Sequence, residues 1–280
     1  MTDIDTRWID AATQASRQRD RGFLASPFAA EAARLESADG AERRAAFLRA
    51  ALRALVDIHR PRISGLMLPA TVKRLIEKEY ARIERNLVNA PGAGFDLRIH
   101  SLRCDFRIVG FGRTPVGVEH IEVGGVPRNL LWKGGGGQAI RLARLFLRTG
   151  GPRPFYVGHL THGIKPHAFL LAYNDKTQEF WHRNVAECLQ MNPHVRGFLA
   201  TSWLYDPQLA RVSPHLAFLR EGSLAHGAVL AHVGPTEGAI KYALAHAPDR
   251  RRLYEAGTYV PTSHAVIWSR EAMLEWAGLR

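Results

Sequence analysis

The sequence has few cysteines and no long apolar run, and these absences narrow the class of protein. Only two of its 280 residues are cysteine, Cys104 and Cys188, and they form no CxxC pair. Neither a disulfide framework nor a cysteine zinc site is therefore expected. The first residues lack the basic start and apolar stretch of a secretion signal, and no stretch of 18 apolar residues is present. We therefore expect no membrane span and a cytoplasmic, reducing location.

The charge balance points to an anionic partner. The formal net charge is +12, from 38 Lys and Arg against 26 Asp and Glu. Such an excess favours nucleic acid, anionic lipid or a phosphorylated ligand such as coenzyme A. Most of the basic residues are arginine, which suits bidentate binding of phosphate or carboxylate. They form no run of five or six like charges, and no nucleic-acid-binding motif accompanies them. A basic nucleic-acid-binding protein is therefore kept only as an alternative.

Residues 1–90 have the apolar spacing of helices. Helical spacing of apolar residues predicts one amphipathic helix over 41–59 and another over 69–88. Residues 89–94, Asn-Ala-Pro-Gly-Ala-Gly, form a connector rich in proline and glycine. The sequence therefore predicts a helical N-terminal segment, 1–90, followed by a main domain over 91–280.

Beyond the connector, apolar and polar residues alternate as in half-buried strands. Four short strands are expected before a run of glycines: 95–100, 102–109, 116–123 and 129–133. After the glycines the expected order is helix 138–147, strand 154–160, helix 177–191, strand 195–203, strand 227–233, helix 237–246, strand 260–268 and a helix from Arg270. This alternation favours an α/β fold with a mixed sheet and helices packed on it.

The glycine run, 134–137, joins an expected strand to an expected helix. Without side chains, its backbone N–H groups can approach an anion closely. The helix N-terminus that follows also favours negative charge, and Lys133 and Arg141 would add to it. A pyrophosphate would fit there, although a plain flexible turn explains the glycines equally well. The run lacks the Lys-Ser/Thr of a Walker loop and the third glycine of a dinucleotide fingerprint.

This layout resembles that of the GNAT-type N-acyltransferases. In that family a strand runs into a loop of the form Gln/Arg-x-x-Gly-x-Gly/Ala, whose backbone holds the pyrophosphate of coenzyme A. Gly137 and Ala139 match the end of this pattern, whereas the basic residue, Lys133, stands one place too early. The resemblance covers about residues 70–205. It implies a GNAT-like fold with an N-terminal helical extension and a C-terminal elaboration. It also implies a site for the pyrophosphate made of Lys133, Gly135, Gly136, Gly137, Gln138 and Ala139.

Histidines are concentrated in the second half, where His159, His162 and His167 lie within nine positions. Three imidazoles can bind zinc or iron, so a histidine-metal oxygenase or hydrolase is a second alternative. Their spacing matches no standard ligand pattern, and we expect no metal. His159, at the end of an expected buried strand, could instead serve as a general base. A histidine that caps the backbone at the strand end would account for it as well.

Polar residues also bunch after the strand over 195–203, where Tyr205 and Asp206 precede a proline. Sites form at sheet ends, so Tyr205 could protonate a leaving thiolate and Asp206 could bind an amine. An Asp-Pro turn with aromatic packing is the structural alternative. The resulting hypothesis is an N-acyltransferase that moves an acyl group from acyl-CoA or an acyl carrier protein to a small-molecule or peptide amine. The acyl carrier protein would then be a partner.

Overall fold

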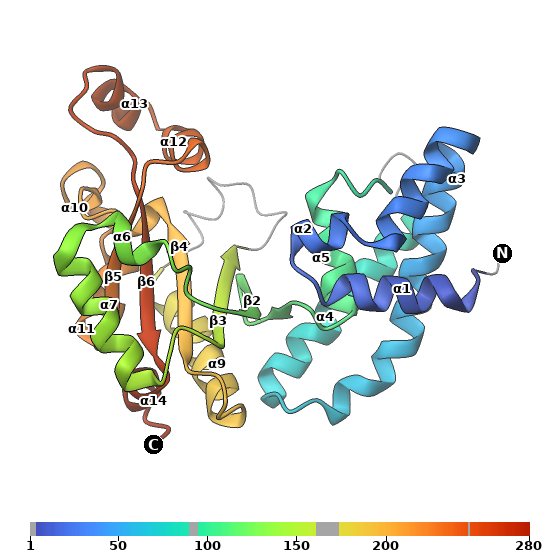
Figure 1. Ribbon diagram of the computed structural model, residues 1–280, viewed down its shortest axis with the longest axis horizontal. Helices are drawn as coiled ribbons and strands as arrows, with labels where there is room; N and C mark the ends of the chain where they lie inside the picture. Colours follow the sequence, from blue (N-terminus) through green and yellow to red (C-terminus); the bar gives the residue numbers. More distant parts are fainter. Residues whose placement is uncertain (1–3, 90–94, 161–173, 246) are drawn as a thin grey trace. The chain divides into compact units, whose positions relative to one another are not determined.

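The computed structural model describes residues 4–89, 95–160, 174–245 and 247–280. The described residues up to Val116 form one compact unit, and those from Gly117 onward form a second (Figure 1). This division falls later than the connector at 89–94, because residues 100–109 fold as a helix of the first unit. No helix in the described ranges is long and apolar enough to cross a membrane.

The first unit is helical, as the sequence predicts. Its elements are α1 (Thr6–Ser16), α2 (Asp20–Leu24), α3 (Pro27–His59), η1 (Arg60–Gly65), α4 (Ala70–Asn89), α5 (His100–Val109) and the two-residue β1 (Thr114–Pro115). Helix α3 begins where Ser26 accepts a hydrogen bond from Ala29 N at 3.2 Å and Pro27 occupies the first turn. It kinks at Gly40, whose φ of +83° a helix cannot continue through.

Helix α5 corrects the expectation of two strands over 95–100 and 102–109. Residues 95–99 form no strand, and His100–Val109 is helical. Leu102, Phe106 and Val109 have the spacing of one face of a helix. Apolar and polar residues also nearly alternate over the same stretch, so the sequence fits the period of a strand as well as that of a helix. Packing decides between them, because Phe106 is fully buried with ring contacts to Phe23 and Phe28 at centroid distances of 5.9 and 5.2 Å.

The second unit contains a mixed sheet with the strand order β2-β3-β4-β6-β5. Its strands are β2 (Glu119–Gly124), β3 (Phe155–Leu160), β4 (Gly197–Ser202), β5 (Val229–Gly234) and β6 (Ser263–Ser269). β3 and β4 run parallel, and the neighbouring pairs β2/β3, β4/β6 and β5/β6 run antiparallel. The expected α/β class with a mixed sheet is confirmed.

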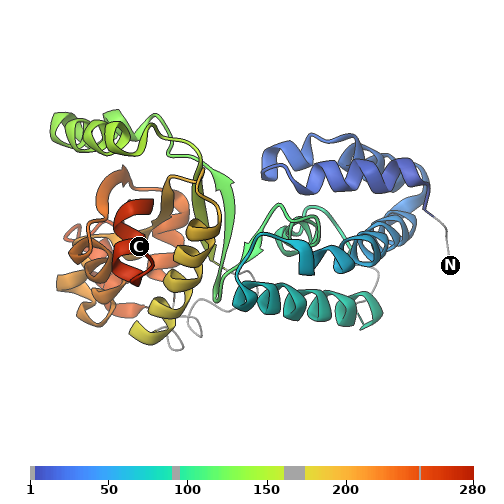
Figure 2. The ribbon, with the colours of Figure 1, turned by 90° about the horizontal axis from the view of Figure 1, so that it is seen from below.

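Helices cover both faces of this sheet (Figure 2). On one face α6 (Leu130–Lys133) and α7 (Gly135–Thr149) pack over Phe155, Leu199 and Ile267. On the other face lie α9 (Asp175–Met191), α11 (Phe218–Ala225) and α14 (Arg270–Ala277), with Trp181 against Phe198 at 5.3 Å between ring centroids. The remaining elements are η3 (Trp203–Tyr205), α10 (Leu209–Val212), η4 (Pro214–Leu216), α12 (Glu237–Leu244) and α13 (Pro248–Glu255).

The expected elements after the glycines are confirmed, within a few residues, from α7 through α14. Before the glycines, the helices expected over 41–59 and 69–88 and the strand expected over 116–123 are also present, whereas the strands expected over 95–100, 102–109 and 129–133 are not. Residues 129–133, expected as a strand, lie in a turn and in helix α6, so β2 is the one strand of the expected meander that lies in this unit. The glycines are consequently not a turn between a strand and a helix, because Gly135–Gly137 already form the first turn of α7.

Candidate functional site at the carboxyl ends of the parallel strands

The parallel strands β3 and β4 separate toward their carboxyl ends. Residues 156–158 pair with residues 198–200, and no further pair joins the two strands in the described part of the chain. β3 nevertheless stays paired with β2 to Leu160, and β4 with β6 to Ser202. Ligands of open α/β sheets bind outside the carboxyl ends of parallel strands. An extended ligand with amide groups can also pair with strand edges in such a gap.

Glu119 lies at this end of the sheet, on β2 opposite Leu160. Its side chain is buried, and burial raises the pKa of the carboxyl group to about 8, because the carboxylate loses its hydration. Gly158 on β3 leaves room for it, since a Cβ there would lie 3.1 Å from Glu119 Oε2 and 2.9 Å from the ring of Phe198. A carboxyl group with a pKa near neutrality can both give and take a proton.

Tyr205 follows β4 directly, in the short helix η3. Ser202 begins this turn by accepting a hydrogen bond from Leu204 N at 3.1 Å. Tyr205 is buried, and its pKa is raised well above the usual value, mainly by burial and further by the charge of Glu119. The phenol is therefore protonated at every physiological pH and lies near enough to Glu119 to interact with it. A protonated phenol is what the acid role predicted for Tyr205 requires.

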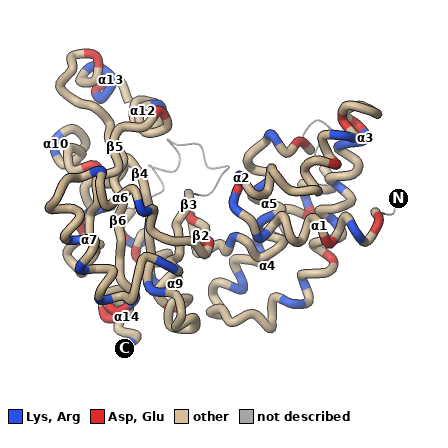
Figure 3. The backbone as a smooth tube through the Cα atoms, viewed as in Figure 1, with Lys and Arg blue, Asp and Glu red and all other residues tan. Residues whose placement is uncertain are grey.

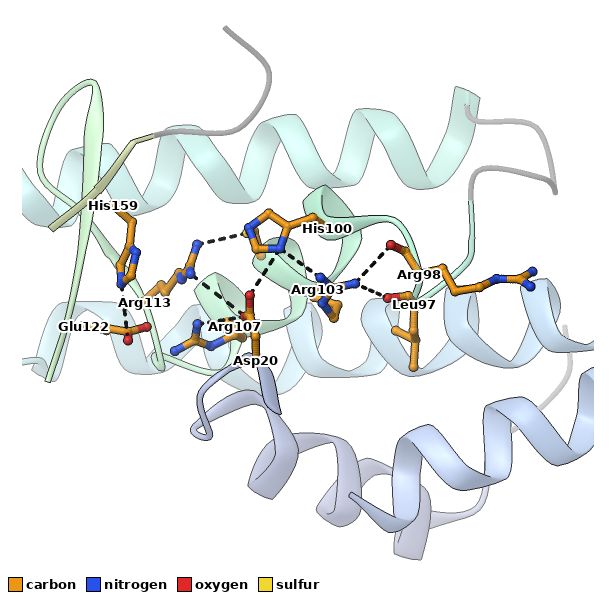
Figure 4. A network of polar contacts seen from close by, with 10 residues as sticks. Asp20, Leu97, Arg98, His100, Arg103, Arg107, Arg113, Glu122 and His159 are labelled. Atoms are coloured by element: carbon orange, nitrogen blue, oxygen red, sulfur yellow. Dashed lines mark hydrogen bonds and ion pairs between the residues drawn. The ribbon is translucent and has the colours of Figure 1, made fainter. Parts of the chain in front are cut away.

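His159 and Glu122 face each other on the opposite side of the sheet from Glu119. His159 lies opposite His120 in the pairing of β2 and β3, and Glu122 shares their face. His159 Nε2 lies 3.2 Å from Glu122 Oε1, and the carboxylate is 4% exposed against 31% for the imidazole (Figure 4). The Glu122 carboxylate therefore lies beside one ring nitrogen of His159, the residue predicted as the general base.

Helix α7 begins at this same edge of the sheet. The side chain of Gln138 binds the backbone of β5 at His232, with Gln138 Nε2 to His232 O at 3.1 Å and His232 N to Gln138 Oε1 at 2.6 Å. His232 pairs with His264, which pairs in turn with Ser202 at the end of β4. β4 and β5 are two strand spacings apart, or about 10 Å. The N-terminus of α7 thus lies on the edge where β3 and β4 separate.

The predicted pyrophosphate residues divide into two groups by environment. Lys133 and Gly135–Gly137 are exposed at the start of α7, and a Cβ at Gly136 would meet nothing within 4 Å. Gln138, in contrast, is 2% exposed and bonds to β5 and to Leu130 O at 2.6 Å. Ala139 is half-buried. The backbone of the glycine run is therefore open to a ligand, whereas the side chain of Gln138 holds the edge strand β5.

Asp206 is buried at the turn that follows Tyr205. Its Oδ1 accepts a hydrogen bond from Gln208 N at 2.9 Å, and its Oδ2 accepts one from Thr262 N at 3.0 Å. Both carboxylate oxygens therefore bind backbone groups and tie this turn to the segment before β6. Binding of an amine by Asp206 stays a prediction.

The histidine cluster extends outside the described residues, because His162 and His167 lie within 161–173. Within the described ranges, no group of three or more His, Cys, Asp or Glu is placed to hold a metal ion.

Sequence reasoning did not find Glu119 or Glu122. Both lie in the alternating stretch over 116–123, which was expected as a half-buried strand with polar residues facing water. In the structure both side chains are buried, Glu119 near Gly158 and Tyr205 and Glu122 beside His159. The available signal was the run Glu119-His120-Ile121-Glu122, in which three of four residues are polar, so at least one polar side chain must lie on the apolar face of the strand.

The fold is similar to that of a solved acyltransferase, whose structure was determined in complex with decanoyl-CoA and teicoplanin. The two chains share 12% sequence identity with a TM-score of 0.53, and the match covers 94% of this chain and 76% of that one. At this identity the likeness concerns the fold alone. No family model matches the sequence, and no curated protein does.

Proposed function

We propose that this protein is an N-acyltransferase that moves an acyl group from acyl-CoA or an acyl carrier protein thioester to the amine of a small molecule or peptide. The observation that carries the proposal is the gap between β3 and β4, with Glu119 and Tyr205 at its edge. The fold shared with an acyltransferase that binds decanoyl-CoA and teicoplanin supports the same class of donor and a small-molecule acceptor.

The donor would lie along the separated strand ends, where its amide groups pair with free backbone edges. Its pyrophosphate would lie at the start of α7, on Lys133 and the backbone of Gly135–Gly137 and Ala139, since a helix N-terminus favours anions. The two positions share one edge of the sheet at a separation of about 10 Å. Gln138 would support this site by fixing the start of α7 to β5 rather than by touching the phosphates.

In the reaction the amine nitrogen attacks the thioester carbonyl, and the carbon–sulfur bond breaks when the tetrahedral adduct collapses. His159, oriented by Glu122, accepts the proton that the amine loses. Tyr205 donates a proton to the departing thiolate, and its raised pKa keeps the phenol protonated at neutral pH before the reaction. Below about pH 8 Glu119 is mainly uncharged, so it places no full negative charge beside the thiolate.

The acid–base roles are tested by Tyr205→Phe and His159→Gln, with acyl-CoA and an amine acceptor. Loss of a positioned acid or base lowers kcat about 10²–10⁴-fold. Matched controls are Tyr242→Phe and His194→Gln, which change the same residue types at exposed positions of the second unit. Activity that survives in both site variants would exclude the proposed roles.

The pyrophosphate site is tested by Gly137→Val. A Cβ at Gly137 meets only Arg141 Nη1, at 3.8 Å, so the fold should tolerate it. The added side chain would cover the first-turn N–H groups and weaken acyl-CoA binding at least about tenfold. Gly238→Val is the control, because Gly238 also lies in an open first helical turn, that of α12. Equal acyl-CoA affinity in the two variants, measured by calorimetry, would place the pyrophosphate elsewhere.

A further inference from the structure

Three arginines line a pocket at the opposite edge of the sheet, where β3 and β4 begin. The pocket has a volume of about 570 Å³ and is lined by Arg128, Gly150, Gly151, Pro152, Arg153 and Arg196. Arg153 comes two residues before β3 and Arg196 one residue before β4, while the glycines end α7. β3 is six residues long, so this edge lies about 20 Å from the proposed acyl-transfer site.

Among the described residues, no acidic side chain lines this pocket. In the described part of the chain, no carboxylate lies within ion-pair distance of Arg128, Arg153 or Arg196. Lys and Arg occur throughout both units (Figure 3), and several exposed arginines elsewhere are paired, such as Arg34 with Glu31 and Arg183 with Glu179. Three unneutralised guanidinium groups around one hollow repel one another and favour a bound anion.

Two glycine positions make room for two of the arginines. A Cβ at Gly151 would lie 2.7 Å from Arg196 Nη1, and a Cβ at Gly125 would lie 2.8 Å from Arg153 Nε. The backbone of Arg196 is fixed on both sides, since its N–H donates to Pro154 O at 2.9 Å and its carbonyl accepts from Arg270 N at 2.8 Å. The negative end of the α7 helix dipole lies at Gly150 and favours one nearby cation. It does not account for three arginines around the same pocket.

The geometry points to a binding site for a phosphate dianion at Arg128, Arg153 and Arg196, separate from the acyl-transfer site. Guanidinium groups bind tetrahedral phosphate through paired, charge-assisted hydrogen bonds. The pocket is also larger than a bare ion needs, so a phosphate monoester on a small molecule fits it as well as free phosphate. Both ligands share the dianionic group that the arginines would recognise.

The test is calorimetric titration of the full chain with inorganic phosphate, glycerol 3-phosphate and acetate at constant ionic strength. Saturable binding of at least one phosphate ligand, with none of acetate, is expected. Each of Arg128→Gln, Arg153→Gln and Arg196→Gln should weaken it about tenfold, the loss of one charge-assisted contact. Tighter binding of the ester would identify a small-molecule phosphate as the ligand, and equal binding would identify free phosphate.

Arg144→Gln is the matched control, because Arg144 is an exposed arginine of α7 that does not line the pocket. Its phosphate affinity should equal that of the native chain. The proposal is overturned if the native chain shows no saturable phosphate binding, or if Arg144→Gln weakens binding as much as Arg196→Gln does. Acyl-CoA affinity should be unchanged in all four variants, and a parallel loss would show that the pocket belongs to the donor site.

Discussion

Asp20 in the first unit and Glu119 in the second are carboxyl groups whose pKa values move in opposite directions. Asp20 lies 3.2 Å from His100 Nδ1, 3.3 Å from Arg107 Nη1 and 4.0 Å from Arg113 Nη2 (Figure 4). The hydrogen bond from His100 and the nearby arginines hold its pKa well below the usual range, although partial burial opposes them. For Glu119, burial raises the pKa to about 8, with no charged neighbour contributing among the described residues.

The difference shows that neighbours decide whether a buried carboxyl group keeps its charge. The Asp20 cluster joins α2 to α5 and serves the stability of the helical unit. Ionisation of the buried Glu119 lowers the stability of the folded protein. Carboxyl groups with such strongly shifted pKa values are concentrated at functional sites. Substitutions of Glu119, Asp20 and His100 test this contrast.

The largest effect is expected for Glu119→Gln at alkaline pH. Because the folded pKa is raised, the native state binds more protons than the unfolded state between about pH 4.5 and 8, and stability falls as pH rises through this window. The neutral amide removes that cost, so the variant should be about 5 kcal/mol more stable than the native chain at pH 9 and similar at pH 4.5. Urea unfolding followed by tryptophan fluorescence measures it. The control is Glu237→Gln at an exposed position. Its difference in stability from the native chain should not change between about pH 4.5 and 9.

Asp20→Asn should have the next largest effect and the opposite sign. It removes a carboxylate from Arg107, which is 1% exposed, and from Arg113, which is 4% exposed. Loss of one member of a buried ion pair is strongly destabilising, and the partial exposure of Asp20 reduces the expected cost to about 2 kcal/mol. Urea unfolding followed by circular dichroism is the measurement. A cost no larger than that of Asp10→Asn, on the exposed side of α1, would contradict the assignment.

A smaller effect is expected from the pH dependence of the same cluster. The hydrogen bond to Asp20, and then that to Cys104, raises the pKa of His100 to about 9. Its contribution to stability is complete below about pH 6.5 and is lost as pH rises to about 9, a change of about 1 kcal/mol after solvent screening. His100→Gln should flatten this part of the stability profile. A profile that keeps its slope in the variant would assign the titration to another group.

The elements differ in how far the sequence alone predicts them. Helix α9 was predicted because its apolar spacing is unambiguous, and Asn174 caps it by accepting a hydrogen bond from Thr177 N at 3.0 Å. Helix α5 was not, because its apolar residues fit strand and helix alike until Phe106 meets Phe23 and Phe28. In the candidate site, the sequence predicts His159 and Tyr205 from their expected places at strand ends, and both lie at such ends.

Local spacing of apolar residues and helix caps are enough to predict the α/β class, the order of elements after the glycines and the helical nature of the first unit. Tertiary structure alone decided which distant residues meet. The burial of Glu119 requires β3 and the turn after β4 to lie beside β2, and the shared pocket of Arg128, Arg153 and Arg196 requires β2, β3 and β4 to assemble side by side. Neither the burial nor the shared pocket depends on a local pattern. Strand pairing and the free-energy cost of removing water from a carboxylate are set by contacts between residues far apart in the chain.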